Sequence, residues 1–111
     1  MSLIKLDLEK VEEVFRNSTH QGEVLEKLYR MVFPDWDRIE RLEGWPVVNR
    51  GTWKHIAKLF MEFDKKHHPE VLPGGLWLNK GFSWDDEVPA GYVDLERCKI
   101  IYKEKEVGKG E

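Results

Sequence analysis

The sequence of 111 residues predicts an α+β domain, with about four N-terminal helices packed with a small C-terminal antiparallel β-sheet. Two observations lead to this prediction. Up to about residue 68, apolar side chains recur every three or four residues, as in amphipathic helices. After Pro69 the pattern changes to short extended runs separated by glycine and proline turns. Helices that precede strands without alternating with them are typical of α+β folds.

The first two helices are predicted from apolar stripes and from residues that suit helix ends. The first follows Asp7, a favoured N-cap residue, and runs to about Asn17. Ser18 and Gln21 have the spacing of a capping box and start the second helix, which stops before Pro34. The two apolar stripes comprise Leu8, Val11, Val14, Phe15, Val24, Leu25, Leu28, Met31 and Val32.

Two further helices are expected in the middle of the chain. A short third helix runs from Pro34 to Leu42 and ends at Gly44. The fourth runs from Thr52, as N-cap, to His68, because Pro69 prevents its continuation. Its apolar face comprises Trp53, Ile56, Ala57, Phe60 and Phe63, and its polar face comprises Lys54, His55, Lys58, Glu62, Lys65 and Lys66. We expect the core to form around this apolar face.

The last third of the chain predicts a small sheet built on a hairpin. Pro73–Gly74–Gly75 is a turn signal, since glycine accepts the positive φ that such a turn needs. Residues 76–78 and 82–84 are predicted to pair across a loop at 79–81. Residues 92–93 and 98–102 are predicted to be extended, and residues 104–111 to form a frayed tail. The whole chain is expected to be a single globular domain.

Composition and charge favour a cytoplasmic protein. Cys98 is the one cysteine, so no internal disulfide forms, as is usual in reducing compartments. The N-terminus lacks the apolar stretch of a secretory signal, and no run is long enough to span a bilayer. The formal net charge of −3 argues against a surface given over to nucleic acid. Residues 50–80, with six basic and three acidic side chains, form a basic middle between acidic ends.

Two clusters of polar side chains suggest a metal site. Asp64, His67 and His68 are three or four residues apart on one helix, and Asp85 and Asp86 follow the predicted hairpin. Together they could hold zinc or manganese for a hydrolase or nuclease. Neither cluster matches an established metal motif. A helix end capped by histidines and a solvated acidic turn explain these residues better, so we expect no cofactor.

The tryptophans and the lysines near them suggest a binding surface. Its predicted members are Trp45, Arg50, Trp53, Lys54, Lys58, Trp77, Lys80 and Trp84. Tryptophan and arginine dominate the energetics of protein interfaces. The same residues could stack single-stranded bases, with Trp45, Arg50, Trp53 and Lys54 as the contacts. Several of these tryptophans are expected to belong to the core.

The sequence favours a non-enzymatic binding or accessory protein that acts through a protein partner or as a homodimer. No catalytic residue is assigned, because no nucleophile, phosphate-loop or dinucleotide motif is present. Cys98 lies in a β-prone run, where a small buried side chain is the ordinary explanation. The alternatives are the metal-assisted hydrolase or nuclease and the single-stranded nucleic-acid binder; neither is favoured.

Overall fold

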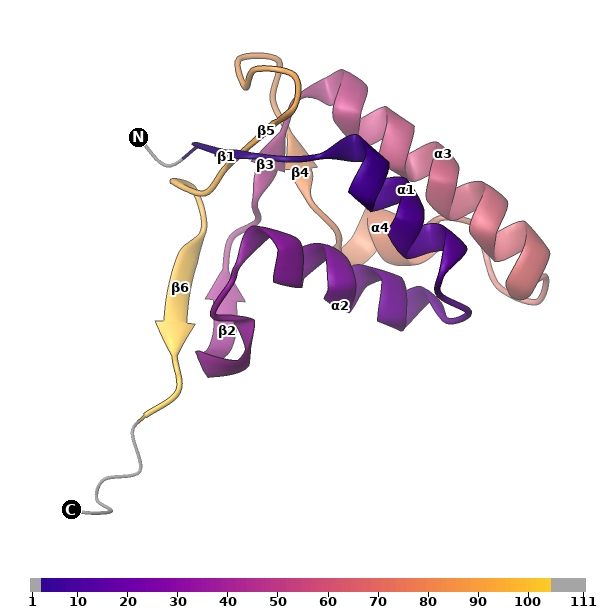
Figure 1. The fold of residues 1–111 in the computed structure, drawn as a ribbon, viewed down its shortest axis with the longest axis horizontal. Coiled ribbons are helices and arrows are strands. Elements are labelled where there is room, and N and C mark those ends of the chain that lie inside the picture. Colours follow the sequence, from indigo (N-terminus) through magenta and orange to yellow (C-terminus); the bar gives the residue numbers. More distant parts are fainter. Residues whose placement is uncertain (1–2, 105–111) are drawn as a thin grey trace.

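The computed structural model describes residues 3–104, in which helices and strands are interspersed (Figure 1). The elements in chain order are β1 (Leu3–Lys5), α1 (Leu8–Arg16), α2 (Gln21–Val32), the 3-10 turn η1 (Trp36–Arg38), β2 (Ile39–Glu43), β3 (Val47–Val48), α3 (Arg50–His67), α4 (Gly75–Lys80), β4 (Ser83–Trp84), β5 (Tyr92–Asp94) and β6 (Lys99–Tyr102). The mixed helix and sheet content agrees with the predicted α+β class. The predicted order of helices first and strands last is wrong. Of the predicted frayed tail, residues 105–111 lie outside the described part of the chain.

The strands form two sheets. The larger has the order β1–β5–β3–β4, and the smaller is a ribbon of β2 and β6. β5 pairs with β1 and with β3 in antiparallel fashion, whereas β3 and β4 are parallel. A parallel pair needs a crossover connection, which α3 and α4 supply between β3 and β4. The ribbon lies at the lower left of the molecule, and the C-terminal ends of α1 and α3 lie on the right-hand side (Figure 1).

The core forms around α3, as the sequence predicts. Ile56 and Phe60 have no exposed surface. The Phe60 ring stacks on Trp77 of α4, with centroids 5.5 Å apart, and meets the edge of Phe15 of α1 at 4.9 Å. Burying one such aromatic side chain contributes about 1.5–3 kcal/mol. α3 therefore joins α1 to α4 through one edge-to-face and one stacked ring contact.

The ends of α3 and α1 show how caps set helix boundaries. Asp7 caps α1 as predicted, its side chain accepting a hydrogen bond from the Glu9 N–H. α3 begins earlier than predicted, because Asn49 and not Thr52 is its N-cap. The Asn49 side chain accepts a hydrogen bond from the Gly51 N–H and donates one to the Val88 carbonyl. One amide thus starts the helix and ties it to a distant loop.

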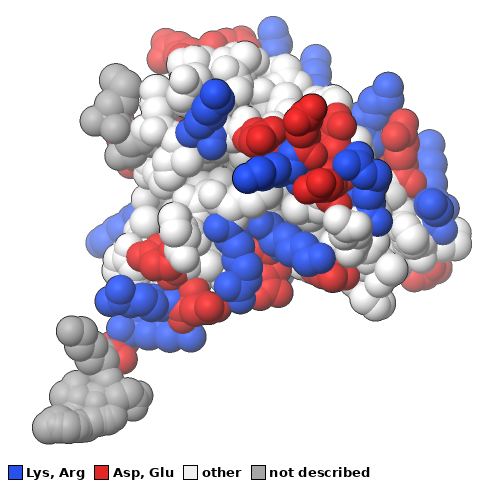
Figure 2. Space-filling model, in the orientation of Figure 1, with Lys and Arg blue, Asp and Glu red and all other residues white. Residues whose placement is uncertain are grey.

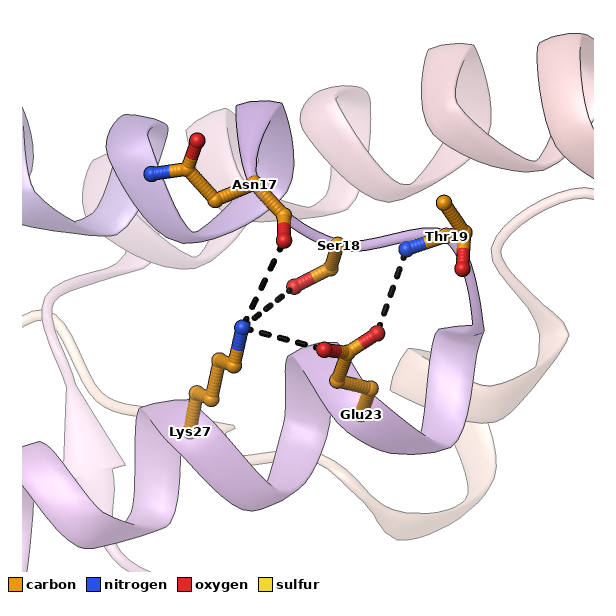
Figure 3. A network of polar contacts seen from close by, with 5 residues as sticks. All are labelled: Asn17, Ser18, Thr19, Glu23 and Lys27. Atoms are coloured by element: carbon orange, nitrogen blue, oxygen red, sulfur yellow. Dashed lines mark hydrogen bonds and ion pairs between the residues drawn. The ribbon is translucent and has the colours of Figure 1, made fainter.

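The turn between α1 and α2 is held by polar contacts that converge on Lys27 and Glu23 (Figure 3). The Lys27 ammonium group lies 3.1 Å from the Glu23 carboxylate and donates to the Ser18 hydroxyl. Glu23 also accepts from the Thr19 N–H, and these contacts lower its pKa, with the Lys27 hydrogen bond the largest cause. The predicted Ser18–Gln21 capping box does not form, because α2 starts only at Gln21.

The predicted third helix is replaced by a short turn and a strand. Residues 36–38 make the 3-10 turn η1, and Ile39–Glu43 then pairs antiparallel with β6. Leu42 lies opposite Ile100 and Arg41 opposite Ile101. Trp36, Ile39 and Leu42 are spaced by three, which suited a helix equally well. Pairing with β6, some 60 residues further along the chain, decided the outcome.

The predicted hairpin at residues 76–84 is also wrong. The apolar run that was assigned to its first strand belongs to α4, which starts after Gly74 (φ +75°) as the turn signal suggests. Gly81 caps its end, where its N–H bonds to the Trp77 carbonyl. A side chain at Gly81 would overlap the Trp77 ring, so glycine is needed there for close packing. Ser83–Trp84 then pairs with β3 and not with a neighbouring hairpin strand.

Candidate functional site

A groove of about 440 Å³ opens between α2, β2 and the end of α4. Its lining is mostly apolar and comprises Leu25, Tyr29, Trp36, Leu42, Gly44, Trp45, Asn79 and Lys80. This volume lies within the range of about 300–1,000 Å³ that is typical of ligand sites. Trp45 and Lys80 were predicted as binding residues, and the fold brings them to the same groove from distant parts of the chain.

Tyr29 forms the floor of the groove and is held from three sides. Its ring stacks between Trp36, at 5.1 Å, and Phe82, at 5.4 Å. Its hydroxyl is shared between the carbonyl oxygens of Lys80, at 2.8 Å, and Gly81, at 3.1 Å. Burial, and to a smaller extent the nearby Cys98, raises the pKa of the Tyr29 phenol well above its ordinary value. The floor is therefore uncharged and fixed in position.

Trp45 forms one edge of the groove and keeps 42% of its surface exposed. It follows Gly44, whose φ of +92° favours glycine. A Cβ atom at Gly44 would also run into the Arg97 carbonyl, so the backbone direction before Trp45 depends on this glycine. Trp45 also borders a second, smaller hollow of about 120 Å³. The second hollow is lined by Trp45, Leu78, Asn79, Gly81, Phe82 and Ser83.

Lys80 is the one charged residue in the lining, and it forms no ion pair within residues 3–104. Two carboxylates that adjoin lining residues in the chain, Glu26 next to Leu25 and Asp37 next to Trp36, are already paired. Arg30 contacts Glu26 at 3.2 Å and Asp37 at 2.8 Å. The Arg30 hydrogen bond holds the pKa of Asp37 below its ordinary value. The groove therefore presents aromatic rings beside an uncompensated ammonium group.

Arg50 and Trp84, also predicted as binding residues, meet at a different surface. The Arg50 guanidinium lies 5.4 Å from the centre of the Trp84 ring and 3.2 Å from the Asp86 carboxylate. Trp84 is 46% exposed. Asp86 therefore competes with any anionic ligand for the Arg50 guanidinium.

Two of the predicted tryptophans belong to the interior. Trp77 is only 1% exposed, so it cannot form part of an exposed binding surface. Trp53 is half-buried against Trp77, with its indole N–H donating to the Phe82 carbonyl at 2.7 Å. Lys54 and Lys58 are exposed on α3, but neither lines the groove. On the face drawn in Figure 2, positive and negative side chains are interspersed.

The predicted metal ligands are not brought together. Asp64 is fully buried and accepts a hydrogen bond from the Gly74 N–H at 2.9 Å, which ties α3 to the start of α4. His67 packs on a phenylalanine ring at 4.6 Å, and His68 is the C-cap of α3. In residues 3–104 no three histidine, cysteine or acidic side chains gather as metal ligands. The five predicted ligands therefore do not form one cluster within these residues.

Asp85 and Asp86 both have arginine partners. Asp86 contacts the first residue of α3, at the opposite end of that helix from Asp64. Asp85 contacts Arg97 at 2.6 Å, and Asp86 contacts Arg50. The pKa of Asp85 lies below its ordinary value, first because it accepts a hydrogen bond from the Glu87 N–H and then because of Arg97. These carboxylates stabilise the turn after β4.

Cys98 provides the one thiol of the sequence. Cys98 is buried, and burial raises the pKa of its thiol, which disfavours the reactive thiolate. In the part of the chain that the structure describes, no helix combines the length and the apolar character that crossing a bilayer requires.

Comparisons with protein-family models, with curated proteins and with solved structures find no match to this chain. The groove is therefore the basis for a functional argument. The sequence reasoning missed Tyr29, Trp36 and Leu42 as groove residues. The density of aromatic residues between positions 29 and 45 was a signal that could have pointed to them.

Proposed function

We propose that this chain is a small, non-enzymatic binding protein that contacts a partner protein through the groove around Trp45. The observation that carries the proposal is one groove that combines a half-exposed tryptophan, a fixed aromatic floor and a lysine with no ion pair among residues 3–104. Hot spots of protein interfaces are enriched in tryptophan and tyrosine that lie in such apolar surroundings. A cytoplasmic location is part of the proposal and rests on the single, buried cysteine.

Selection from a displayed library of random dodecapeptides tests the proposal. The wild-type protein is immobilised, and the selected peptides are then measured against two variants. Trp45→Ala removes the groove edge, whereas Trp84→Ala removes a similarly exposed tryptophan elsewhere. We expect Trp45→Ala to weaken binding by at least about 2 kcal/mol, roughly thirtyfold in Kd, and Trp84→Ala to leave it unchanged.

Two results would count against the groove as the binding surface. One is the absence of enriched peptides, and the other is enrichment that survives Trp45→Ala. Analytical ultracentrifugation of the wild-type protein over a range of concentrations shows whether the partner is a second copy. Self-association that is lost in Trp45→Ala and kept in Trp84→Ala would identify a homodimer built on the same groove.

A further inference from the structure

The groove presents aromatic rings to whatever occupies it. Both faces of the Tyr29 ring are covered, one by Trp36 and the other by Phe82. An occupant of the groove therefore meets the edge of Tyr29 and the indole rings of Trp36 and Trp45. Aromatic rings attract one another in edge-to-face and offset-stacked arrangements. The groove, of about 440 Å³, therefore suits one aromatic side chain of a partner.

Lys80 adds a positive charge beside these rings. Its carbonyl oxygen accepts the hydrogen bond of the Tyr29 hydroxyl at 2.8 Å, so the root of its side chain is fixed next to the aromatic floor. Its ammonium group forms no ion pair among residues 3–104. A flexible four-carbon stem lets this group reach an anion that is held near the rings. A carboxylate close to the aromatic side chain of the occupant would complement it.

The geometry of a polypeptide limits where this carboxylate comes from. In an extended segment, neighbouring side chains point to opposite sides, so an acidic residue next to the aromatic one would face away from Lys80. At the end of a chain, the α-carboxylate and the side chain are attached to the same Cα atom and stay close in every conformation. A C-terminal aromatic residue therefore brings both groups to the groove together.

The smaller hollow of about 120 Å³ has a mostly polar lining and continues the groove. Trp45 and Asn79 line both hollows, so they lie where the two meet. The Asn79 side chain donates to the Gly75 carbonyl, and within the described residues its own Oδ1 atom has no hydrogen-bond donor. Ser83 adds a hydroxyl group. Backbone N–H and C=O groups require such partners, so this lining suits the main chain that precedes the aromatic residue.

We infer that the groove binds the C-terminus of a partner protein whose last residue is aromatic. The aromatic side chain lies against Trp36 and Trp45, the terminal carboxylate pairs with Lys80, and the preceding main chain runs past Asn79 into the smaller hollow. This inference rests on the proposed function, because it names the part of the partner that the groove takes.

The test compares three acetylated pentapeptides in NMR titrations of the ¹⁵N-labelled full chain. The acid probe is Gly-Ser-Gln-Ser-Trp with a free carboxylate, and the amide probe is the same peptide with a C-terminal amide. The shifted-charge probe is Gly-Ser-Glu-Ser-Trp with a C-terminal amide, which has the net charge of the acid probe. We expect the acid probe to bind about fivefold more tightly than either other probe, since an exposed charge pair contributes up to about that factor. The shifts should centre on Trp45, Asn79 and Lys80.

Two lysine variants show whether Lys80 is the partner of the carboxylate. Lys80→Gln should make the acid and amide probes equal without weakening the amide probe, and Lys58→Gln should leave the preference unchanged. Both lysines are exposed, so the spectra of the variants should stay those of the folded protein. High salt should reduce the preference in the wild type.

Two further measurements test the chain end and the main chain before it. When the displayed dodecapeptides are presented with free carboxyl ends, aromatic residues should be enriched at the last position. N-acetyltryptophan should bind at least about threefold more weakly than the acid probe, because it lacks the main chain that the smaller hollow takes.

Several outcomes would overturn the inference. Equal binding of the acid and shifted-charge probes would show that the carboxylate need not be at the chain end. Equal binding of all three probes that is lost in Trp45→Ala would refute the chain end and leave the proposed function standing. N-acetyltryptophan that binds as tightly as the acid probe would show a small-ligand site. No shifts at millimolar probe would also refute the inference, while selection of internal peptide segments decides the proposed function separately. Shifts that centre on Trp84 would place binding on another surface and refute both.

Discussion

Replacing Tyr29 by phenylalanine tests how the floor of the groove is joined to α4. The substitution removes one hydroxyl and keeps the ring between Trp36 and Phe82. That hydroxyl is shared between the carbonyl oxygens of Lys80 and Gly81, and the contact with Gly81 is buried. Its loss leaves a buried acceptor without this donor, and such a loss costs about 1–3 kcal/mol.

The expected loss is large enough to measure by urea unfolding or by thermal melting. For a domain of this size, about 1–3 kcal/mol corresponds to a fall in Tm of roughly 4–15 °C. Tyr92→Phe is the matched control, because Tyr92 is 38% exposed and its hydroxyl has no hydrogen bond within the described residues. Its effect should stay within about 0.5 kcal/mol. Equal, small losses in the two variants would refute this account of the Tyr29 hydroxyl.

The pH dependence of stability gives a second measurement on the same variant. The folded protein holds the Tyr29 proton more tightly than the unfolded chain does, because burial raises the pKa of this phenol. The stability that Tyr29 contributes is therefore fully present below about pH 10 and is lost as the pH rises further. Tyr29→Phe should be less sensitive to pH in this range than the wild type. An identical decline in both proteins would contradict the reasoning.

Further predictions concern two buried side chains, Phe60 and Cys98, and two glycines, Gly81 and Gly22. Phe60→Ala should cost about 3–5 kcal/mol in denaturant unfolding, because Phe60 is fully buried and stacks on Trp77; a loss below about 1 kcal/mol would contradict its central place. Gly81→Ala should lower Tm, because the added methyl group would overlap the Trp77 ring. Gly22→Ala should raise Tm by a few degrees, since Gly22 lies in α2 with open space around it; changes of the same sign in the two glycine variants would count against this packing. Cys98 should react with a thiol reagent at pH 8 only after unfolding, because burial raises its pKa and shields it; rapid reaction of the native protein would show that the thiol is accessible.

Part of the site could be predicted from the sequence, and part could not. Trp45 and Lys80 were predicted as binding residues from their residue types, and the structure places both in the lining of one groove. Tyr29 and Trp36 were not predicted, because their role depends on a stack that joins α2 to η1. Trp77 was assigned to the surface with the same reasoning as Trp45, and only its packing against Phe60 separates the two. A residue type indicates what a side chain can do, but burial decides whether it is available.

The sequence by itself determined α1, α2 and α3, the cap at Asp7 and the turn at Gly74. These features depend on contacts between residues a few positions apart, so a local pattern contains the information that forms them. Only the tertiary structure decided that residues 39–43 form a strand and residues 75–80 a helix. A short apolar run satisfies its backbone hydrogen bonds in either form, and the choice follows from distant partners. The groove has the same origin, because its walls come from residues 25–45 and 79–80, which meet only when α4 packs against α2.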